Sequence, residues 1–173
     1  QTATNLMNVI NTSSGPSGTR FTATVGGTAA ATATITITDY TELNAGDKVN
    51  LVAADGTNYN FTQGDQSSVN GTFEATTSND QTASNLMNVI NTSSGPAGTR
   101  FTATVDGAVV TVTQATAGAT GNTTITLTDS WSAGMTKTNF TGGVAGTRVS
   151  LTTTDGTTIT ATATVVSGTT TTT

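Results

Sequence analysis

The stretch QTASNLMNVINTSSGPAGTRFTATV at residues 81–105 decides the fold, because the chain contains it twice. Residues 1–25 read QTATNLMNVINTSSGPSGTRFTATV and differ from the second copy at only two positions. Internal repetition of this kind indicates a tandem array of one structural module. Residues 45–51 match residues 145–151 at an offset of 100, which sets the module length.

The repeat divides the chain into three expected parts. Residues 1–44 form a partial first repeat with a helix, a hairpin and a strand, and residues 45–144 form a complete module. Residues 145–173 form a hairpin that begins a further repeat, and we expect it to complete a neighbouring subunit.

Alternation of apolar and polar residues predicts the strands of the complete module. Thr makes up 47 of the 173 residues, and its β-branched side chain favours strands. We expect hairpins at 48–62 and 99–113 and a strand at 123–129. A three-residue loop in the first hairpin places Leu51 opposite Tyr59, and a turn at Asp106-Gly107 in the second places Ala103 opposite Val110.

A helix is expected between the two hairpins. Ala83, Leu86, Met87 and Ile90 follow helical spacing, and Ser78 is a suitable N-cap. We expect this apolar face, and its first copy, to be buried against a sheet. The predicted fold class is therefore mainly β (α+β), with tandem β-sandwich-like modules that each carry one short helix packed on a sheet.

The two ends of the chain look complementary. The first copy begins inside its helix, whereas the hairpin at 148–166 has no helix after it. An isolated hairpin and an uncapped helix are both marginal in water. We therefore expect head-to-tail self-assembly by donor-strand complementation, in which backbone hydrogen bonds extend a sheet. The residues expected to carry this assembly are Val149, Leu151, Ile159, Ala161, Leu6 and Ile10.

The inventory of reactive side chains predicts a protein that is not an enzyme and holds no cofactor. There is no His and no Cys, which excludes Ser-His-Asp and Cys-His arrangements and zinc sites built on those residues. The net charge is −5 with only five basic residues, so no nucleic-acid partner is expected. No apolar run reaches 18 residues, so no membrane insertion is expected.

Calcium and glycans are the candidate small partners. Ca²⁺ is a minor hypothesis that rests on carboxylates at expected strand ends, at Asp39, Asp55, Asp129 and Asp155. Turn formation is the favoured role of Asp55 and Asp155, because each precedes Gly. The glycosylation motif Asn-x-Ser/Thr occurs at Asn11, Asn60, Asn70, Asn91, Asn122 and Asn139.

The duplicated stretch, together with AVVTVTQATAGATGNTTITLTDS at 108–130, resembles Thr/Gly-rich tandem repeats in structural proteins of environmental phages and in bacterial surface fibres. The resemblance implies a role in assembly or adhesion, outside the cell or on a virion surface. Two functions stay open. One is a structural subunit of an extracellular fibre or filament, and the other is a stalk or receptor-binding segment of a phage tail fibre or bacterial adhesin.

Overall fold

The computed structural model describes residues 2–13, 21–26, 28–67, 69–94, 100–146, 148–153 and 158–162. The chain forms two compact units. Unit 1 comprises Gln1–Ala29 and Val144–Thr173, and unit 2 comprises the intervening residues Ala30–Gly143. The described part is mainly β, with strands in three sheets and two α-helices, which confirms the expected mainly-β, α+β class at this level. The division into repeat copies concerns sequence relatedness and stays a prediction.

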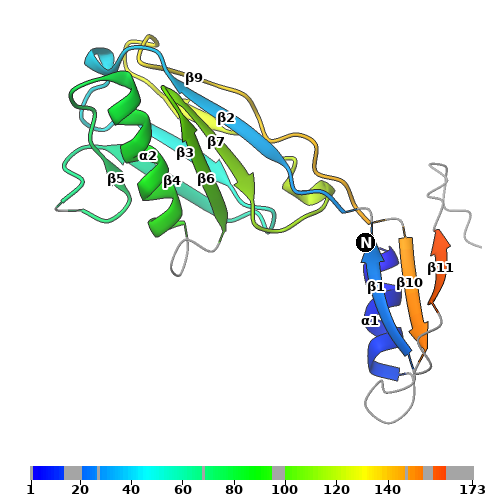
Figure 1. Ribbon diagram of the computed structural model, residues 1–173. Coiled ribbons are helices and arrows are strands. Elements are labelled where there is room, and N and C mark those ends of the chain that lie inside the picture. The colour runs from blue at the N-terminus through cyan, green and yellow to red at the C-terminus, as the bar shows by residue number, and fades with distance from the viewer. Residues whose placement is uncertain are drawn as a thin grey trace, which may run out of the picture. The chain divides into compact units, whose positions relative to one another are not determined.

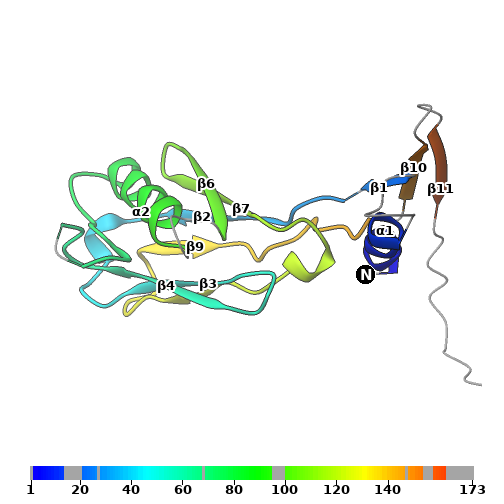
Figure 2. The same ribbon diagram turned by 90° about the horizontal axis from the view of Figure 1, so that it is seen from below.

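Unit 2 contains two four-stranded sheets. One has the order β6 (Phe101–Asp106), β7 (Val109–Gln114), β2 (Thr32–Ile37) and β9 (Met135–Lys137). The other has the order β5 (Thr72–Phe73), β4 (Asn58–Gln63), β3 (Lys48–Val52) and β8 (Thr126–Thr128). Neighbouring strands are antiparallel except β4 and β5, which are parallel. Figure 2 shows β3 and β4 in a layer separate from β2, β6 and β7.

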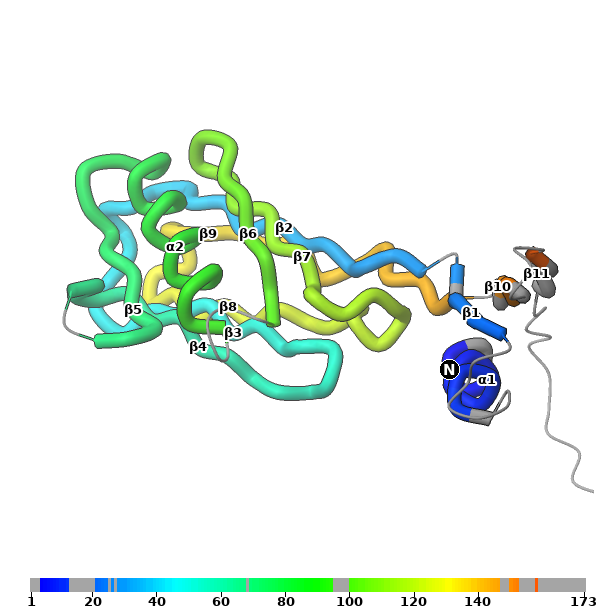
Figure 3. The backbone as a smooth tube through the Cα atoms, turned by 60° about the horizontal axis from the view of Figure 1, so that its bottom comes forward, coloured from blue at the N-terminus to red at the C-terminus, as the bar shows by residue number. Residues whose placement is uncertain are grey.

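Helix α2 (Asn79–Ser93) packs against strands of both sheets in unit 2. Its N-cap is Ser78, whose hydroxyl accepts a hydrogen bond from the Gln81 amide at 3.1 Å, as the sequence predicts. Leu86 and Ile90 are fully buried in one core that also contains the inward side chains of both sheets. Figure 1 shows α2 lying beside β6 and β7, and Figure 3 traces the same neighbours along the backbone.

The first hairpin of unit 2 confirms the predicted register. Leu51 lies opposite Tyr59, and the Ala53 amide donates to the Thr57 carbonyl at 2.8 Å, which closes a three-residue loop. Gly56 in that loop has φ +85°, a backbone conformation that favours glycine.

The register predicted for the second hairpin is wrong by two residues. Ala103 lies opposite Val112 instead of Val110, because the turn is formed by Gly107 and Ala108. Gly107 has φ +53° and takes the first central position, where a two-residue turn of this kind requires a positive φ. The predicted strand at 123–129 is shorter in the structure and spans Thr126–Thr128.

Unit 1 contains one three-stranded sheet and one helix. The strand order is β1 (Phe21–Gly26), β10 (Arg148–Thr153) and β11 (Thr158–Thr162), and both pairings are antiparallel. Helix α1 (Thr2–Ser13) packs against β1 and β10. Ala29 and Val144 exchange two backbone hydrogen bonds of 3.1 and 3.0 Å, so the two segments that enter unit 2 begin as a paired ribbon. The short 3-10 helices η2 (Tyr40–Glu42) and η4 (Ala119–Gly121) belong to unit 2.

Candidate assembly site

An asparagine ties each helix to the strand that follows it. In unit 2 the Asn91 Nδ2 donates to the Ala103 carbonyl at 2.9 Å, and the Ala103 amide donates to Asn91 Oδ1 at 2.8 Å. In unit 1 Asn11 makes the same two hydrogen bonds with Ala23, at 3.0 and 2.7 Å. We call this arrangement the asparagine clasp. The repeated sequence therefore forms the same local structure in both units.

The clasp also identifies which edge of each strand remains for a neighbouring strand. In an antiparallel sheet, the amide and carbonyl of one residue point to the same edge. Those groups of Ala103 bind Asn91, so β7 occupies the opposite edge of β6. Those groups of Ala23 bind Asn11, so β10 occupies the corresponding edge of β1.

The register of β10 on β1 equals that of β7 on β6. Ala23 lies opposite Leu151 where Ala103 lies opposite Val112. The next pairs along the strands also correspond, since Val25 is paired with Val149 and Val105 with Val110. Strand β10 of the C-terminal hairpin therefore pairs with β1 in the same way that β7 pairs with β6 in unit 2.

The third strand continues this equivalence. Ile159 of β11 lies opposite Leu151, just as Ala33 of β2 lies opposite Val112. The sheet β1-β10-β11 thus reproduces three strands of the sheet β6-β7-β2-β9. Among the described residues, unit 1 contains no counterpart of the second sheet, β5-β4-β3-β8.

The predicted assembly residues of the C-terminal hairpin pair with one another in unit 1. Val149 pairs with Ala161, and Leu151 pairs with Ile159, which confirms the register predicted for this hairpin. The partly buried side chains of Met7, Ile10 and Leu151 surround the buried Ala23.

The predicted burial of Leu6 is wrong. Its side chain is 49% exposed, whereas Leu86 at the equivalent position of α2 is fully buried. Two further pairs behave alike, since Val9 is 58% and Phe21 is 39% exposed while Val89 and Phe101 are buried. The reason is that the sheet covering these positions in unit 2 has no described counterpart in unit 1.

Side-chain contacts of Phe101 show what covers this face in unit 2. Its ring packs edge-on against Tyr59 of β4, with centroids 5.8 Å apart. It also stacks on Phe140, with centroids 5.7 Å apart. Phe21 occupies the same position of the repeat in unit 1 and is exposed. Leu6, Val9 and Phe21 are thus more exposed than the residues at the same repeat positions in unit 2.

Three of the four carboxylates proposed for calcium, Asp39, Asp55 and Asp129, accept hydrogen bonds from backbone amides. Asp39 accepts hydrogen bonds from the amide and hydroxyl of Thr41, and these bonds lower the pKa of Asp39. Asp55 accepts the Thr57 amide at 3.0 Å, which lowers its pKa, and it also pairs with Arg100 at 2.6 Å. These contacts agree with a role in turns.

Asp129 organises the loop between β8 and β9 in the same way. It accepts hydrogen bonds from the amides of Trp131, Gly134 and Met135. Asp155 lies outside the described residues. Within the described ranges no group of three or more His, Cys, Asp or Glu side chains gathers to hold a metal ion, and calcium stays a hypothesis.

Three of the six glycosylation motifs have their asparagine in a backbone clasp. Asn11 and Asn91 use both side-chain amide atoms, as described above. Asn122 donates to the Gly143 carbonyl at 3.0 Å and accepts the Gly143 amide at 2.8 Å. A glycan on Nδ2 of any of the three would compete with its donated hydrogen bond. The other three motif asparagines, Asn60, Asn70 and Asn139, are exposed, as is Asn122.

Two buried polar residues were not found by sequence reasoning. Asp47, which is 1% exposed, accepts hydrogen bonds from the Asn44 amide and from both the amide and the hydroxyl of Ser130. Gln114 is also buried and joins β7 to the β3–β4 hairpin through Val52 and Ala54. The alternation of Val110, Val112 and Gln114 along β7 was a usable signal, because it places Gln114 on the inward face.

No known family model matches the chain, and no curated protein matches it significantly. In the described part of the chain, neither helix has the length and apolar character needed to cross a membrane.

Proposed function

We propose that this protein is a structural, non-catalytic subunit of an extracellular or virion-surface fibre, which assembles head to tail by exchange of the β10–β11 hairpin. Its architecture is a tandem of sandwich-like modules in which unit 1 is an incomplete copy of unit 2. One observation carries the proposal. The β10–β11 hairpin occupies the same edge of β1, in the same register, as β7 and β2 occupy beside β6.

Exchange between chains needs no contact other than those seen within the chain. The hairpin and β1 belong to opposite ends of the sequence, and unit 2 lies between them in the chain. If the hairpin of one chain pairs with β1 of the next, the same backbone and side-chain contacts form between subunits. Such an interface joins two different surfaces, so it builds an open filament unless the rotation closes a ring.

Protein concentration determines whether the hairpin pairs with β1 of its own chain, the closed form, or with β1 of another chain, the exchanged form. Within one chain, the pairing of Ala29 with Val144 holds the two strands close and favours the closed form. Exchange between chains gains from high local protein concentration, as on a surface where many copies are delivered together. We therefore expect monomers at low concentration and polymers at high concentration.

Assembly can be tested with engineered cysteine pairs, because the chain contains no natural cysteine. Ala23→Cys with Leu151→Cys places two thiols on a non-hydrogen-bonded pair, where Cα atoms lie about 4.5 Å apart, within disulfide range. Oxidation at high protein concentration should give a ladder of multimers on a non-reducing gel. The matched pair Ala103→Cys with Val112→Cys lies inside unit 2 and should give only monomers.

A mixing experiment gives a second readout. Proteins that carry Ala23→Cys alone and Leu151→Cys alone are combined at high concentration and oxidised. A mixed disulfide dimer forms under exchange, and each single variant alone gives far less of it. If the double variant yields only monomers at every concentration and the mixture gives no dimer, hairpin exchange is wrong.

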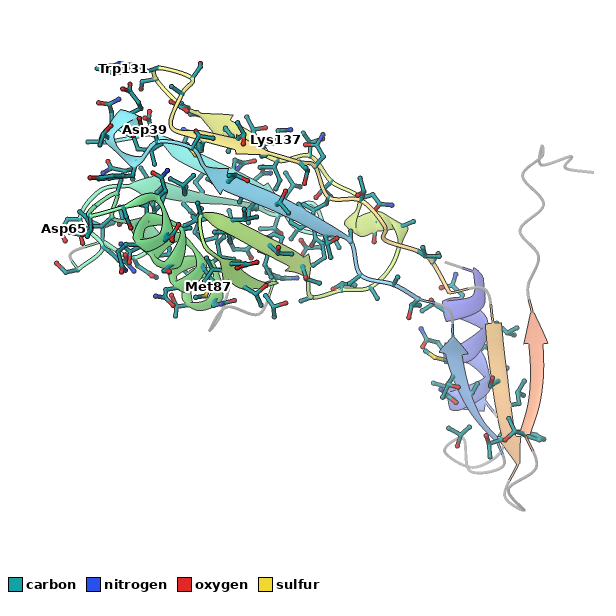
Figure 4. All side chains as sticks on the ribbon, turned by 45° about the horizontal axis from the view of Figure 1, so that its top comes forward. Asp39, Asp65, Met87, Trp131 and Lys137 are labelled. Atoms are coloured by element: carbon teal, nitrogen blue, oxygen red, sulfur yellow. The ribbon has the colours of Figure 1, made fainter. Side chains whose placement is uncertain are left out.

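The alternative function, a stalk or receptor-binding segment, is favoured by one feature. Trp131 is 66% exposed and projects from the loop between β8 and β9 (Figure 4). Its position is held by Asp129, which binds the amides on both sides of the turn. Exposed, pre-ordered tryptophans are frequent anchors of binding surfaces. If Trp131→Ala abolishes attachment to host cells while polymerisation is unchanged, this alternative is preferred.

A further inference from the structure

Asn70 is the only asparagine in the sequence that is followed directly by glycine. Asparagine is a labile residue, and its decomposition begins when the backbone nitrogen of the next residue attacks the side-chain carbon Cγ. A side chain on that next residue obstructs the attack, whereas glycine has no Cβ and leaves the approach open. The sequence therefore places the most reactive asparagine of the chain at this position.

The turn that contains Asn70 leaves both reacting nitrogens unbound. Asn70 is exposed, and the Thr72 amide donates to the Val69 carbonyl at 3.3 Å, which closes the turn around Asn70 and Gly71. Gly71 has φ +84°, a conformation that glycine adopts without strain. Among the described residues, no acceptor binds the Gly71 amide or the Asn70 Nδ2. Neither nitrogen therefore has to give up a protein hydrogen bond in order to react.

Ser93, the last residue of α2, binds the side-chain carbonyl group of Asn70. Its hydroxyl donates to Asn70 Oδ1 at 2.5 Å. A donor at this oxygen polarises the carbonyl group and stabilises the negative charge that develops on Oδ1 when Cγ is attacked. The contact therefore activates the amide of Asn70 towards the neighbouring Gly71 nitrogen.

We propose that Asn70 and Gly71 form a site of spontaneous self-modification, which converts Asn70 into aspartate and isoaspartate. The Gly71 nitrogen forms a bond to Cγ of Asn70, the bond from Cγ to Nδ2 breaks, and the amide proton leaves with Nδ2 as ammonia. Water then opens the resulting succinimide ring at either of its carbonyl groups, which gives the two products. Water is the only co-reactant, and no group is oxidised or reduced. The reaction is independent of hairpin exchange.

Both products alter the connection between β5 and α2. Each places a carboxylate beside Ser93, at the C-terminal end of the helix dipole, where negative charge is unfavourable. Isoaspartate also adds a carbon to the main chain directly before β5, whose Thr72 and Phe73 are buried. The reaction is therefore a slow, irreversible change that loosens this part of unit 2 as the protein ages.

Peptide mass spectrometry of the full chain, aged at mildly alkaline pH, measures the reaction at each asparagine. The protein is made in a host without N-glycosylation, because a glycan on Asn70 would occupy Nδ2. Asn60 and Asn139 are internal controls, since both are exposed and accept hydrogen bonds at Oδ1, but each precedes Phe. Asn70 should become an acid at least about tenfold faster than either control, because only glycine leaves the attack unobstructed.

Hydroxylamine provides an independent readout, because it cleaves a chain at succinimides. The aged parent should give fragments 1–70 and 71–173. Asn70→Gln keeps an amide at this position but disfavours ring formation, and it should stay intact. Conversion at Asn70 that is no faster than at Asn60 and Asn139, or a parent that hydroxylamine does not cleave between residues 70 and 71, overturns the proposal.

The role of the Ser93 hydroxyl is tested by Ser93→Ala. This change should slow the conversion of Asn70 several-fold in the folded protein, whereas a general loosening of the turn would accelerate it. In concentrated urea the contact is lost, so the variant and the parent should react at equal rates. Ser84→Ala is the matched control on the same helix, since the Ser84 hydroxyl binds the Asp80 carbonyl, and it should react like the parent. A Ser93→Ala rate that equals or exceeds the parent's in the folded protein overturns the activation by Ser93.

Discussion

Asn91 closes two hydrogen bonds with the backbone of Ala103, one donated by its Nδ2 and one accepted by its Oδ1. Both residues are at least partly buried, and Ala103 belongs to the outermost strand of its sheet. An edge strand exposes unpaired amides and carbonyls that invite further strands. The clasp occupies these groups at Ala103, so it joins helix to sheet and also protects one edge.

Removing the clasp should destabilise unit 2. Asn91→Ala removes both hydrogen bonds to Ala103 and a weaker one that Asn91 Nδ2 donates to the Met87 sulfur. The loss of the Asn91 partner of the Ala103 amide and carbonyl should cost about 2–3 kcal/mol in the free energy of unfolding. Urea denaturation followed by circular dichroism measures this change. Asn88→Ala is the control, because Asn88 is exposed on the same helix, and it should cost less than about 0.5 kcal/mol. Equal stabilities of the two variants would show that the clasp contributes nothing.

The two leucines of the repeat give a matched comparison in one chain. Leu86→Ala should cost about 2–5 kcal/mol, because Leu86 is fully buried and its loss leaves a cavity. Leu6→Ala should cost less than about 1 kcal/mol in dilute monomer, because half of Leu6 is already exposed. Chemical denaturation of both variants at low concentration separates the two values. A similar cost at both positions would contradict the difference in environment between the units.

Local rules account for what the sequence predicted correctly. The register of Leu51 opposite Tyr59 follows from alternation and from a loop that needs Gly56, and the Ser78 cap follows from its position before the helix. The register predicted for the second hairpin was wrong, although the same rules were used. The turn requires a positive φ at its first position, so it begins at Gly107 instead of Asp106.

Non-local pairing accounts for what the sequence did not predict. Strand β2 inserts between β7 and β9, and β10 pairs with β1 across most of the chain length. Alternation predicts which face of a strand is apolar, and it contains no information about which strand lies beside it. The exposure of Leu6 was missed for the same reason, because a buried and an exposed copy share one sequence.

The environment of Asp47 predicts how the free energy of unfolding depends on pH. Burial acts to raise the pKa of Asp47, but the hydrogen bonds from Ser130 and Asn44 together outweigh it, so the pKa lies below its ordinary value. The unfolded chain then binds the proton more readily than the folded protein does. The stabilisation by Asp47 is therefore complete above the unfolded pKa of about 4 and is lost as the pH falls through the lower folded value.

Asp47→Asn should flatten this acid-dependent loss of stability. We expect the free energy of unfolding to be lower than that of the parent at pH 7 and to converge towards it near pH 2. Guanidinium denaturation at several pH values provides the measurement. Asp65→Asn is the control, because Asp65 is exposed, in contrast to the buried Asp47, and accepts hydrogen bonds from the amide and hydroxyl of Ser67. A parallel shift at all pH values in the Asp47 variant would refute the assignment.

The hydrogen bonds of Gln114 join the two sheets of unit 2, so replacing this residue tests how much they stabilise the unit. Its Oε1 accepts the Ala54 amide at 3.1 Å, and its Nε2 donates to the carbonyls of Val52 and Gly121 at 2.9 and 3.3 Å. Gln114→Met keeps a side chain of similar length and removes the hydrogen bonds, so it isolates the polar contribution. We expect a loss of about 2–4 kcal/mol, since the partly buried Ala54 amide then loses the acceptor that Gln114 provides.

Hydrogen exchange distinguishes this loss from a general weakening of the fold. In Gln114→Met, the amides of the β3–β4 loop, including Ala54, should exchange faster relative to those of β6 and α2. Gln63→Met is the comparison, because the Gln63 side-chain oxygen is buried without a hydrogen-bond partner among the described contacts. Removing it should cost little or increase stability. A uniform increase in exchange across unit 2 for Gln114→Met would show that the residue supports the core as a whole and does not specifically join the sheets.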